Sequence, residues 1–486
     1  MSKTTVLYKD VAPGADEDAS VSAVWQDKDS NIDAIPFGVE PDPVATLELN
    51  NWLLNGGFKL KETQRLAFWS SELSGEDCAF ANPPSITFDF TNQYSSTGIT
   101  LVFDRSAGNY CRKVNVKWMQ GETVKADTDF FPDGTTYFCK QIASSYDKII
   151  VTFLETSLPY RYAKVEHIVF GVHRQFGMAE LRSASVVNEM DVVSESLPIS
   201  TFKWTLDSRE DVDFMFQLKQ PVEIKNDNNL IGVYYIDSHN RKTQRIYDIR
   251  CHDALGVLDG TPFDGGVYTD TSAKELLADV VGGDFEIVYS EDVSDTALSG
   301  VLRSGTKRSA IQQILFAWGV CMATDGGAAL RVFNVSDALE EIGKDRTFYG
   351  VTVDTKAIVT EVRVTAHTYS QNENGSVEIG GVKYSDAQSI YSVKNPDVTA
   401  NDKQNVKEFT GATLVSPENA QAVAQRLYDW YLRRGTTKAS IVWRGESLGD
   451  YVLLPNGWGD NSEGTVTKME LKLSNTVVAK CESVGV

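Results

Sequence analysis

The 486-residue sequence has few of the residues that usually hold metals or cofactors. It contains six cysteines and five histidines. No two cysteines form a C-x-x-C pair, and no histidine has a partner at the spacing of a metal site. We therefore expect no metal and no cofactor, and we interpret the cysteines as small buried apolar residues. They are Cys78, Cys111, Cys139, Cys251, Cys321 and Cys481.

Long apolar runs are also missing. The longest, such as residues 148–154, fall far short of the roughly 18 residues that cross a bilayer. Residues 1–10 lack the apolar stretch and the cleavage site of a secretory signal. The sequence thus predicts no membrane anchor and folding in the cytoplasm of the cell that makes the protein.

Basic residues are fewer than acidic ones: the chain has 46 Lys and Arg and 67 Asp and Glu, which gives a net charge of −21. Such a surface repels phosphate backbones, which disfavours tight nucleic-acid binding. Two interpretations stay open. The charge serves solubility, or it lines a channel through which DNA slides without sticking.

Catalytic motifs are absent as well. Gly326-Gly327 and Gly380-Gly381 are typical of turns and form neither a P-loop nor a dinucleotide fingerprint. No serine sits in a nucleophile elbow. A glycosidase needs two carboxylates across a cleft. Pairs such as Glu361 and Glu378 can be nominated, but nothing distinguishes them from solvated surface residues. We therefore expect that the chain is not an enzyme.

What the sequence does contain is the pattern of a mainly β protein with α+β parts and a few short helices. Residues 1–48 are acidic and rich in turn residues, which predicts an extended arm with little core of its own. Residues 49–175 alternate apolar and polar side chains in short runs, as in a β-sandwich. Ile86, Phe88 and Phe90 share one face of such a strand.

The remaining sequence is divided into three parts: a β-domain at 176–260, an α/β insertion at 261–345, and a second β-domain at 346–486. Helices are predicted at 273–281, where Ser272 and Glu275 form a capping box, and at 307–318, which Gly319 ends. A third is predicted at 416–434, with Ser416 as N-cap. We find no exact internal repeat.

Parts of residues 181–333 resemble the hub proteins of phage tails, the family of the late-control protein D and of contractile-tail baseplate hubs. The resemblance extends to the closing part of the chain through residue 480, and it covers about 300 of the 486 residues. It lies in patterns of fold and not in catalytic motifs. The matching segments are 181–191 (LRSASVVNEMD), 197–206 (LPISTFKWTL), 220–224 (QPVEI), 253–259 (DALGVLD) and 418–428 (ENAQAVAQRLY).

This resemblance implies tail-tube-like β-barrel hub domains and a homotrimer. Two tube-like domains in each of three chains match a sixfold tube, while the trimer offers threefold symmetry to a spike. The β-rich halves of 180–486 should then fold as two versions of one ring-forming unit. Met215 and Phe216 are candidate interface residues, because Met and aromatic residues are enriched at interface cores. Burial in their own domain is the alternative.

The implied partners are the tail tube protein, the tip spike, baseplate wedge or distal tail proteins and a tape-measure protein, with DNA only passing through the channel. The implied location is the tail tip or baseplate of a virion assembled in the host bacterial cytoplasm. Contractile, flexible and bacteriocin-type tails all stay open.

A second resemblance, over residues 52–171, is to galactose-binding-like jelly-roll domains. Segments 82–90 (NPPSITFDF), 97–103 (TGITLVF) and 160–168 (YRYAKVEHI) carry it. In that family sugars bind loops at one end, so Asp104, Arg105 and Trp118 are candidate glycan contacts. Trp118 alternates with Val114 and Val116, which favours an inward position, and such domains also serve as spacers. The alternative function for the chain is therefore a carbohydrate-binding adhesin or glycosidase at the bacterial cell surface.

Overall fold

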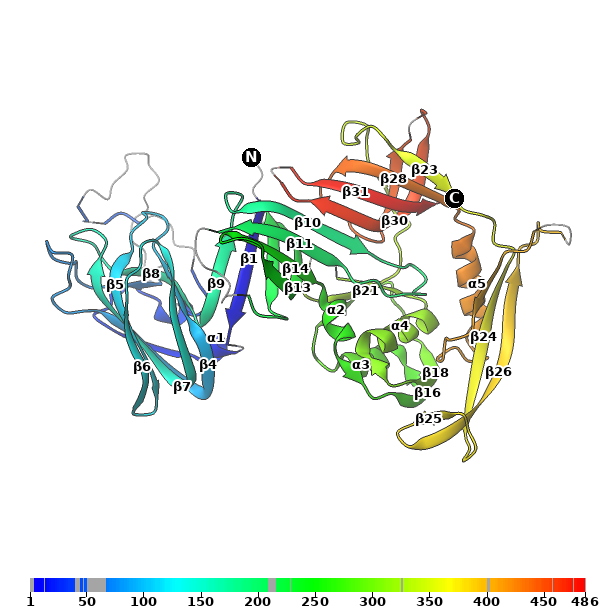
Figure 1. Ribbon diagram of the computed structural model, residues 1–486, viewed down its shortest axis with the longest axis horizontal. Coiled ribbons are helices and arrows are strands. Elements are labelled where there is room, and N and C mark those ends of the chain that lie inside the picture. The colour runs from blue at the N-terminus through cyan, green and yellow to red at the C-terminus, as the bar shows by residue number, and fades with distance from the viewer. Residues whose placement is uncertain are drawn as a thin grey trace. The chain divides into compact units, whose positions relative to one another are not determined.

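The computed structural model describes residues 4–12, 14–39, 44–46, 48–49, 67–208, 216–227, 229–324, 327–399, 403–456, 458–474 and 476–485. The chain divides into two compact units: unit 1 comprises Met1–Leu7 and Phe176–Val486, and unit 2 comprises Tyr8–Gln175. The chain passes between them within β1 (Thr4–Val11) and at the end of β9 (Gly171–Phe176). Strands dominate the described residues and helices are few and short, which confirms the mainly β fold class (Figure 1).

Unit 2 is built on one seven-stranded sheet, in which β3, β8, β4, β7, β5 and β6 are neighbours in that order and β2 pairs with β4. Its elements are α1 (Ala15–Asp18), β2 (Ser20–Val24), the 3-10 helix η1 (Ile32–Ala34), β3 (Phe68–Trp69), β4 (Ser85–Phe103), β5 (Cys111–Gln120), β6 (Thr123–Phe130), β7 (Thr136–Thr156) and β8 (Lys164–Val169).

The two long strands β4 and β7 explain why unit 2 has one hydrogen-bonded sheet instead of the two separate sheets expected for a sandwich. Their pairing continues from Ser85 to Val102 and shifts register at β-bulges between Asp89 and Gly98. Bulges bend strands, so β4 pairs with β2 at its start and with β8 at its end. Gly98 has φ +152, and a Cβ there would lie 2.1 Å from the Cys139 carbonyl oxygen, so the bend needs glycine.

The described residues between Tyr8 and Glu48 belong to unit 2 and are not a free arm. β2 forms an antiparallel pair with residues 85–89 of β4, and Ala15 and Ile35 are buried in the unit's core. Turn residues and acidic side chains indicated few core positions here, and the buried apolar residues are indeed few. Edge pairing with β4, which no local pattern reveals, holds the segment to the sheet.

Unit 1 contains the remaining strands and the longer helices. The helices are α2 (Ala254–Asp259), α3 (Ala273–Val281), α4 (Lys307–Trp318) and α5 (Ala420–Tyr431). The strands are β10 (Leu181–Glu189), β11 (Thr201–Asp207), β12 (Pro221–Asn226), β13 (Asn229–Arg241), β14 (Ile246–His252), β15 (Pro262–Phe263), β16 (Gly266–Ser272), β17 (Ile287–Tyr289), β18 (Ala297–Leu302), β19 (Gly305–Thr306), β20 (Cys321–Ala323), β21 (Leu330–Phe333), β22 (Leu339–Glu341), β23 (Thr352–Thr355), β24 (Glu361–Gln371), β25 (Val377–Ile379), β26 (Val382–Lys394), β27 (Val406–Phe409), β28 (Gly435–Val442), β29 (Tyr451–Pro455), β30 (Asn461–Lys472) and β31 (Val478–Gly485).

Helix ends in unit 1 follow their local signals closely. Ser272 accepts a hydrogen bond from the Glu275 N–H at the start of α3. Gly319 ends α4 with φ +96 in the left-handed region. Both helices have the predicted bounds. α5 begins later than expected, with Asn419 and not Ser416 as N-cap, because the Asn419 side chain accepts from the Ser416 N–H and holds residues 416–419 as a turn.

Unit 1 contains the same five-strand arrangement twice. Across the sheet, repeat A has the order β10-β11-β14-β13-β12, and repeat B has the order β23-β28-β31-β30-β29. In each repeat the first two strands pair, and the last three form a meander whose final strand returns to the second. Every one of these pairs is antiparallel. The two β-rich halves, which were predicted to be versions of one unit, thus share one strand order.

The repeats also match in register. In repeat A a β-bulge interrupts the β13–β14 pair between Ile236 and Ser238. In repeat B a bulge interrupts the β30–β31 pair at the same place, between Val466 and Lys468. Aligning the two bulges sets residues 238–242, the end of β13 and the residue after it, against β30 residues 468–472. The neighbouring pairs then match as well, since Tyr235 pairs with Pro221 and its counterpart Thr465 pairs with Tyr451.

The helices α2, α3 and α4 lie between repeats A and B in the sequence, and α5 lies within repeat B, between β23 and β28. Together they form a core of their own. α2, α3 and α4 pack together, and α5 packs against the ribbon of β24 and β26 (Figure 1). Leu277, Ile311, Ile314 and Leu427 are buried in this cluster. The apolar stripes that predicted the helices are therefore core contacts.

Candidate assembly interface

Repeats A and B are joined by one strand pair, which shows how one such unit binds another. β10 of repeat A lies antiparallel to the second half of β30 of repeat B, with Ser185 opposite Lys472 and Glu189 opposite Lys468. β29 occupies the same edge of β30 at its first half, residues 461–465. At the junction, β10 is therefore added to the edge of β30 just beyond the point where β29 ends.

Side chains reinforce this junction on both faces. Val186 and its partner Leu471 are buried, as are Asn188 and Met469. The Asn188 Oδ1 accepts a 2.6 Å hydrogen bond from the Tyr234 hydroxyl, which links β10 to the meander of its own repeat. At the rim, Lys468 and Glu189 form an exposed ion pair at 2.9 Å. A buried centre that contains an apolar pair, with a polar rim around it, is the anatomy of a specific interface.

The other end of each repeat leaves the corresponding positions uncovered by any strand of the described chain. β23, the counterpart of β10, pairs with β28 and stands last in the sheet order. Thr352, Asp354 and Thr355 are exposed. Among the strands that the structure describes, residues 238–240 of β13 pair with β14 alone, and Ser238 and Asn240 are exposed. Both edges carry the geometry that the β10–β30 junction uses.

Of the two interface residues suggested by composition, Phe216 is described and Met215 lies outside the described residues. Phe216 is buried, and its ring packs against Trp204 with a centroid distance of 5.8 Å and against Phe176 at 6.2 Å. His239 and Tyr247 also contact it. Phe216 therefore belongs to the aromatic core of repeat A, which was the alternative weighed for it.

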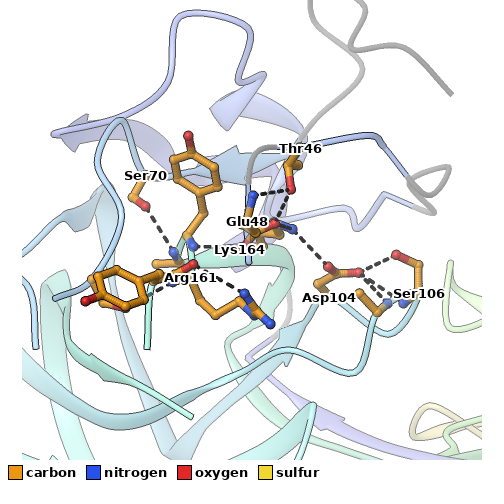
Figure 2. A network of polar contacts seen from close by, with 12 residues as sticks. Thr46, Glu48, Ser70, Asp104, Ser106, Arg161 and Lys164 are labelled. Atoms are coloured by element: carbon orange, nitrogen blue, oxygen red, sulfur yellow. Dashed lines mark hydrogen bonds and ion pairs between the residues drawn. The ribbon is translucent and has the colours of Figure 1, made fainter. Parts of the chain in front are cut away.

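Unit 2 contains a buried polar cluster around Lys164 (Figure 2). The Lys164 Nζ lies 2.5 Å from Glu48 Oε2 and 3.5 Å from Asp104 Oδ2, and the Lys164 and Glu48 side chains are almost fully covered. Glu48 also accepts from the Tyr162 N–H and the Thr46 hydroxyl. The ammonium group lies 4.3 Å from the Trp69 ring centroid. Because Lys164 is paired with two carboxylates, these contacts hold together the loops that carry them.

The candidate glycan contacts Asp104 and Arg105 are already engaged at the end of β4. Asp104 Oδ1 accepts from the N–H and hydroxyl of Ser106, which makes a tight turn (Figure 2). Arg105 binds Glu166 through its backbone N–H and its Nε, at 2.8 and 2.6 Å. Burial raises the pKa of Glu166 even though Arg105 counteracts it. The Arg105 side chain stays half exposed, so glycan contact at this loop stays a prediction.

Trp118, the third glycan candidate, is fully buried in the core of unit 2. Its ring packs edge-on against Phe130 at a centroid distance of 6.4 Å. Val114 and Val116, with which it alternates, are buried on the same face of β5. The ring is therefore covered by protein and is not an exposed platform for a sugar, as the alternation favoured.

The nominated carboxylate pair is held far apart. Glu361 lies opposite Lys394 at one end of β26, and Glu378 lies opposite Lys383 at the other. These positions are eleven residues apart along an extended strand, which is roughly 35 Å. Glycosidases need their two carboxyl groups within about 10 Å. Glu361 also binds Arg363, with two hydrogen bonds of 2.9 and 3.0 Å.

A buried histidine and aspartate, His367 and Asp386, resemble part of a catalytic triad but are arranged differently. The His367 Nδ1 lies 2.9 Å from an Asp386 carboxylate oxygen, and its Nε2 lies 3.1 Å from the Thr410 carbonyl oxygen. Both ring nitrogens thus face acceptors, so neither is free to take a proton from a nucleophile. The pair ties the β24–β26 ribbon to the segment before α5.

Among the residues that the structure describes, no group of three potential ligands is placed to hold a metal ion. Within the same residues, none of the helices combines the length and apolarity that a bilayer crossing requires. The described cysteines are all buried and unpaired with one another. Burial raises the pKa of Cys321 and Cys481 to about 12, so their thiols stay protonated and unreactive at neutral pH.

Comparison with known proteins finds neither a matching family model nor a matching curated protein. Among solved structures, the chain is similar to the tail protein from Neisseria meningitidis MC58, with 12% identity and a TM-score of 0.47 over 64% of this chain and 93% of that one. It is similar to the 43 kDa tail protein of prophage MuSo2 from Shewanella oneidensis (9%, 0.46, 65% and 96%). It is also similar to prophage tail protein gp18 from Listeria monocytogenes EGD-e (11%, 0.43, 63% and 91%).

Sequence reasoning missed the residues that matter most to these sites. Glu48 lies in a segment interpreted as an acidic arm, and nothing in the sequence marks it as the partner of Lys164. The β10–β30 junction joins segments from the two ends of unit 1, so no local pattern could reveal it. The one available signal was the strict alternation in both strands, which placed Val186 and Leu471 on buried faces without showing that they meet.

Proposed function

We propose that this chain is a non-enzymatic structural subunit of a phage-type tail: a hub that closes the end of the tail tube as a homotrimer. In that role it links the tube protein to the tip spike and to baseplate wedge or distal tail proteins. The tape-measure protein and DNA pass along its axis. The observation that carries the proposal is the repeated five-strand unit, joined within one chain by the β10–β30 pair.

The junction is of the kind that builds rings. It uses two different surfaces, the first strand of one repeat and the fourth strand of the other, and is therefore heterologous. A heterologous contact that recurs closes into a ring when its rotation permits. Three chains supply six repeats, which gives a sixfold-like ring with true threefold symmetry. Such a ring matches a sixfold tube on one side and a threefold spike on the other.

The charge of the chain suits this role. A net charge of −21 disfavours binding to the backbone of a passing nucleic acid. The repeats consist of antiparallel strands, and those of β11 and β14 carry mostly partly exposed polar residues on one face, a surface suited to a wetted channel wall. The paired charges, and the His367 ring with both nitrogens facing acceptors, favour a structural role over a catalytic one.

Native mass measurement tests the proposal. The single chain weighs 53.7 kDa, and we expect a species of three times that mass at micromolar concentration. Negative-stain images of that species should show a ring with a central opening. A monomer at all accessible concentrations, with a folded circular dichroism spectrum, would overturn the trimeric hub. The sample should also show no turnover of peptidoglycan.

A further inference from the structure

We propose that β23 of one chain adds to the edge of β13 in the next chain, in the register that β10 and β30 already use within the chain. The inference rests on the proposed ring function and deepens it by naming the seam and its residue pairs. The occupant of both edges is a second copy of this chain.

The register follows from matching the two repeats. β10 and β23 each pair with the second strand of their repeat, and aligning those pairs sets Ser185 on Thr352 and Val187 on Asp354. The bulges set Lys472 on Lys242 and Glu470 on Asn240. The in-chain pair of Val187 with Glu470 therefore becomes a pair of Asp354 with Asn240 of the neighbouring copy.

The seam then has five residue pairs, each a counterpart of one in the β10–β30 junction. Reading along β23 and the residue after it, they are Thr352 with Lys242, Val353 with Arg241, Asp354 with Asn240, Thr355 with His239, and Lys356 with Ser238. No like charges stand directly opposite one another, an arrangement that would oppose strand pairing.

Backbone hydrogen bonding agrees with this register on both edges. The Lys356 N–H donates to the carbonyl of Arg434, the residue just before β28. The backbone groups of residues 352, 354 and 356 therefore bond to the β28 side, and those of residues 353 and 355 point outward. The Lys242 N–H donates to Ile246, so residues 239 and 241 of β13 point away from β14. The seam sets Val353 opposite Arg241 and Thr355 opposite His239, so the outward-pointing backbone groups of one edge meet those of the other.

The same parity holds in the existing junction. The Met190 N–H donates to the Thr467 carbonyl at 2.9 Å, and the Leu473 N–H donates to Ala184 at 3.0 Å. Val187 and Glu470 therefore form a non-hydrogen-bonded pair, the closely spaced type with a Cα separation of about 4.5 Å. That spacing lies at the short end of the range a disulfide accepts.

Cysteine cross-linking tests the seam on the full chain. Asp354→Cys with Asn240→Cys should link neighbouring copies under mild oxidation, because both side chains are exposed at a closely spaced pair. Val187→Cys with Glu470→Cys is the matched control, since it occupies the equivalent pair and should close within one chain. Asp354→Cys with Asn229→Cys places the second thiol at the far end of β13 and is the out-of-register control.

We expect the seam variant to shift on non-reducing gels from 53.7 kDa to bands of two and three chains. The in-chain control should run as a single chain with both introduced thiols consumed. The out-of-register variant should also run as a single chain, with both introduced thiols free. If native mass shows a trimer and the in-chain control closes, but the seam variant does not link, the seam is wrong and the ring uses another surface. If every variant is a folded monomer, the seam and the proposed function both fail.

Discussion

Val187 of β10 lies directly opposite Glu470 of β30, in the strand pair that joins repeat A to repeat B. The two residues belong to opposite ends of unit 1, so the pair forms only when both repeats have folded. Stability of unit 1 should therefore depend on the apolar residues that flank it.

Leu471→Ala removes the buried partner of Val186 from the junction. We expect the free energy of unfolding of unit 1 to fall by about 2–5 kcal/mol, because the cavity cannot collapse between two paired strands. Denaturant titration followed by tryptophan fluorescence measures it. Ile390→Ala, at an exposed position of β26, should change stability by less than about 0.5 kcal/mol. Equal effects from the two variants would contradict a packed junction.

Glu48→Gln leaves the Lys164 ammonium group buried without its nearest carboxylate. We expect unit 2 to lose about 3–5 kcal/mol, since breaking one side of a buried pair strands the other charge. Replacing both residues, Glu48→Gln with Lys164→Met, should restore much of the loss. Lys148→Met removes the exposed pair with Asp89 and should cost at most about 1 kcal/mol. Calorimetry on all four proteins decides whether the cluster is structural.

His167 should make unit 2 less stable in mild acid. Burial lowers the pKa of His167 from its ordinary value of 6.5, and the nearby Lys9 and Arg105 act in the same direction, against Asp16 and the Pro36 carbonyl. The unfolded chain therefore takes up the proton first, and stability is lost as pH falls from about 6.5 towards the folded pKa. His167→Gln should flatten this dependence between pH 7 and pH 5. His252→Gln in unit 1 should not, and a wild-type profile without slope would contradict the prediction.

Ser238 should tune assembly by charge, because the proposed seam sets it opposite Lys356 of the next copy. Ser238→Glu creates an opposite-charge cross-strand pair, and Ser238→Lys creates a like-charge pair, each worth about 0.2–1 kcal/mol. We expect association to tighten by a few-fold in the first variant and to weaken similarly in the second. Mass photometry over a dilution series measures both. The same direction of change in both variants would rule out this contact.

The fold class and the helices were predictable because their signals are local. Ser272 with Glu275 and Gly319 act within one turn of the chain, and the alternation of Ile86, Phe88 and Phe90 sets a strand face without reference to any partner. The repeat was not predictable in this way. Matched positions such as Trp204 and Ala439, or His239 and Met469, share a face and a register but no chemistry, so sequence comparison within the chain finds nothing.

The sites divide along the same line. The buried position of Trp118 could be predicted from its alternation with Val114 and Val116 on β5. The pairing of Glu48 with Lys164 depends on two segments brought together by tertiary structure. The partner strand of β30 depends on where β29 stops, which the turn residues after Pro455 do not reveal.

The covalent link between repeats A and B has a consequence for how such an assembly is made. The proposed ring would contain two kinds of boundary. The boundary within a chain would close as that polypeptide folds, at any concentration, and the boundary between chains would close only when chains meet. Dilution would then open only the boundaries between chains, so each chain would complete its own pair of repeats before it associates.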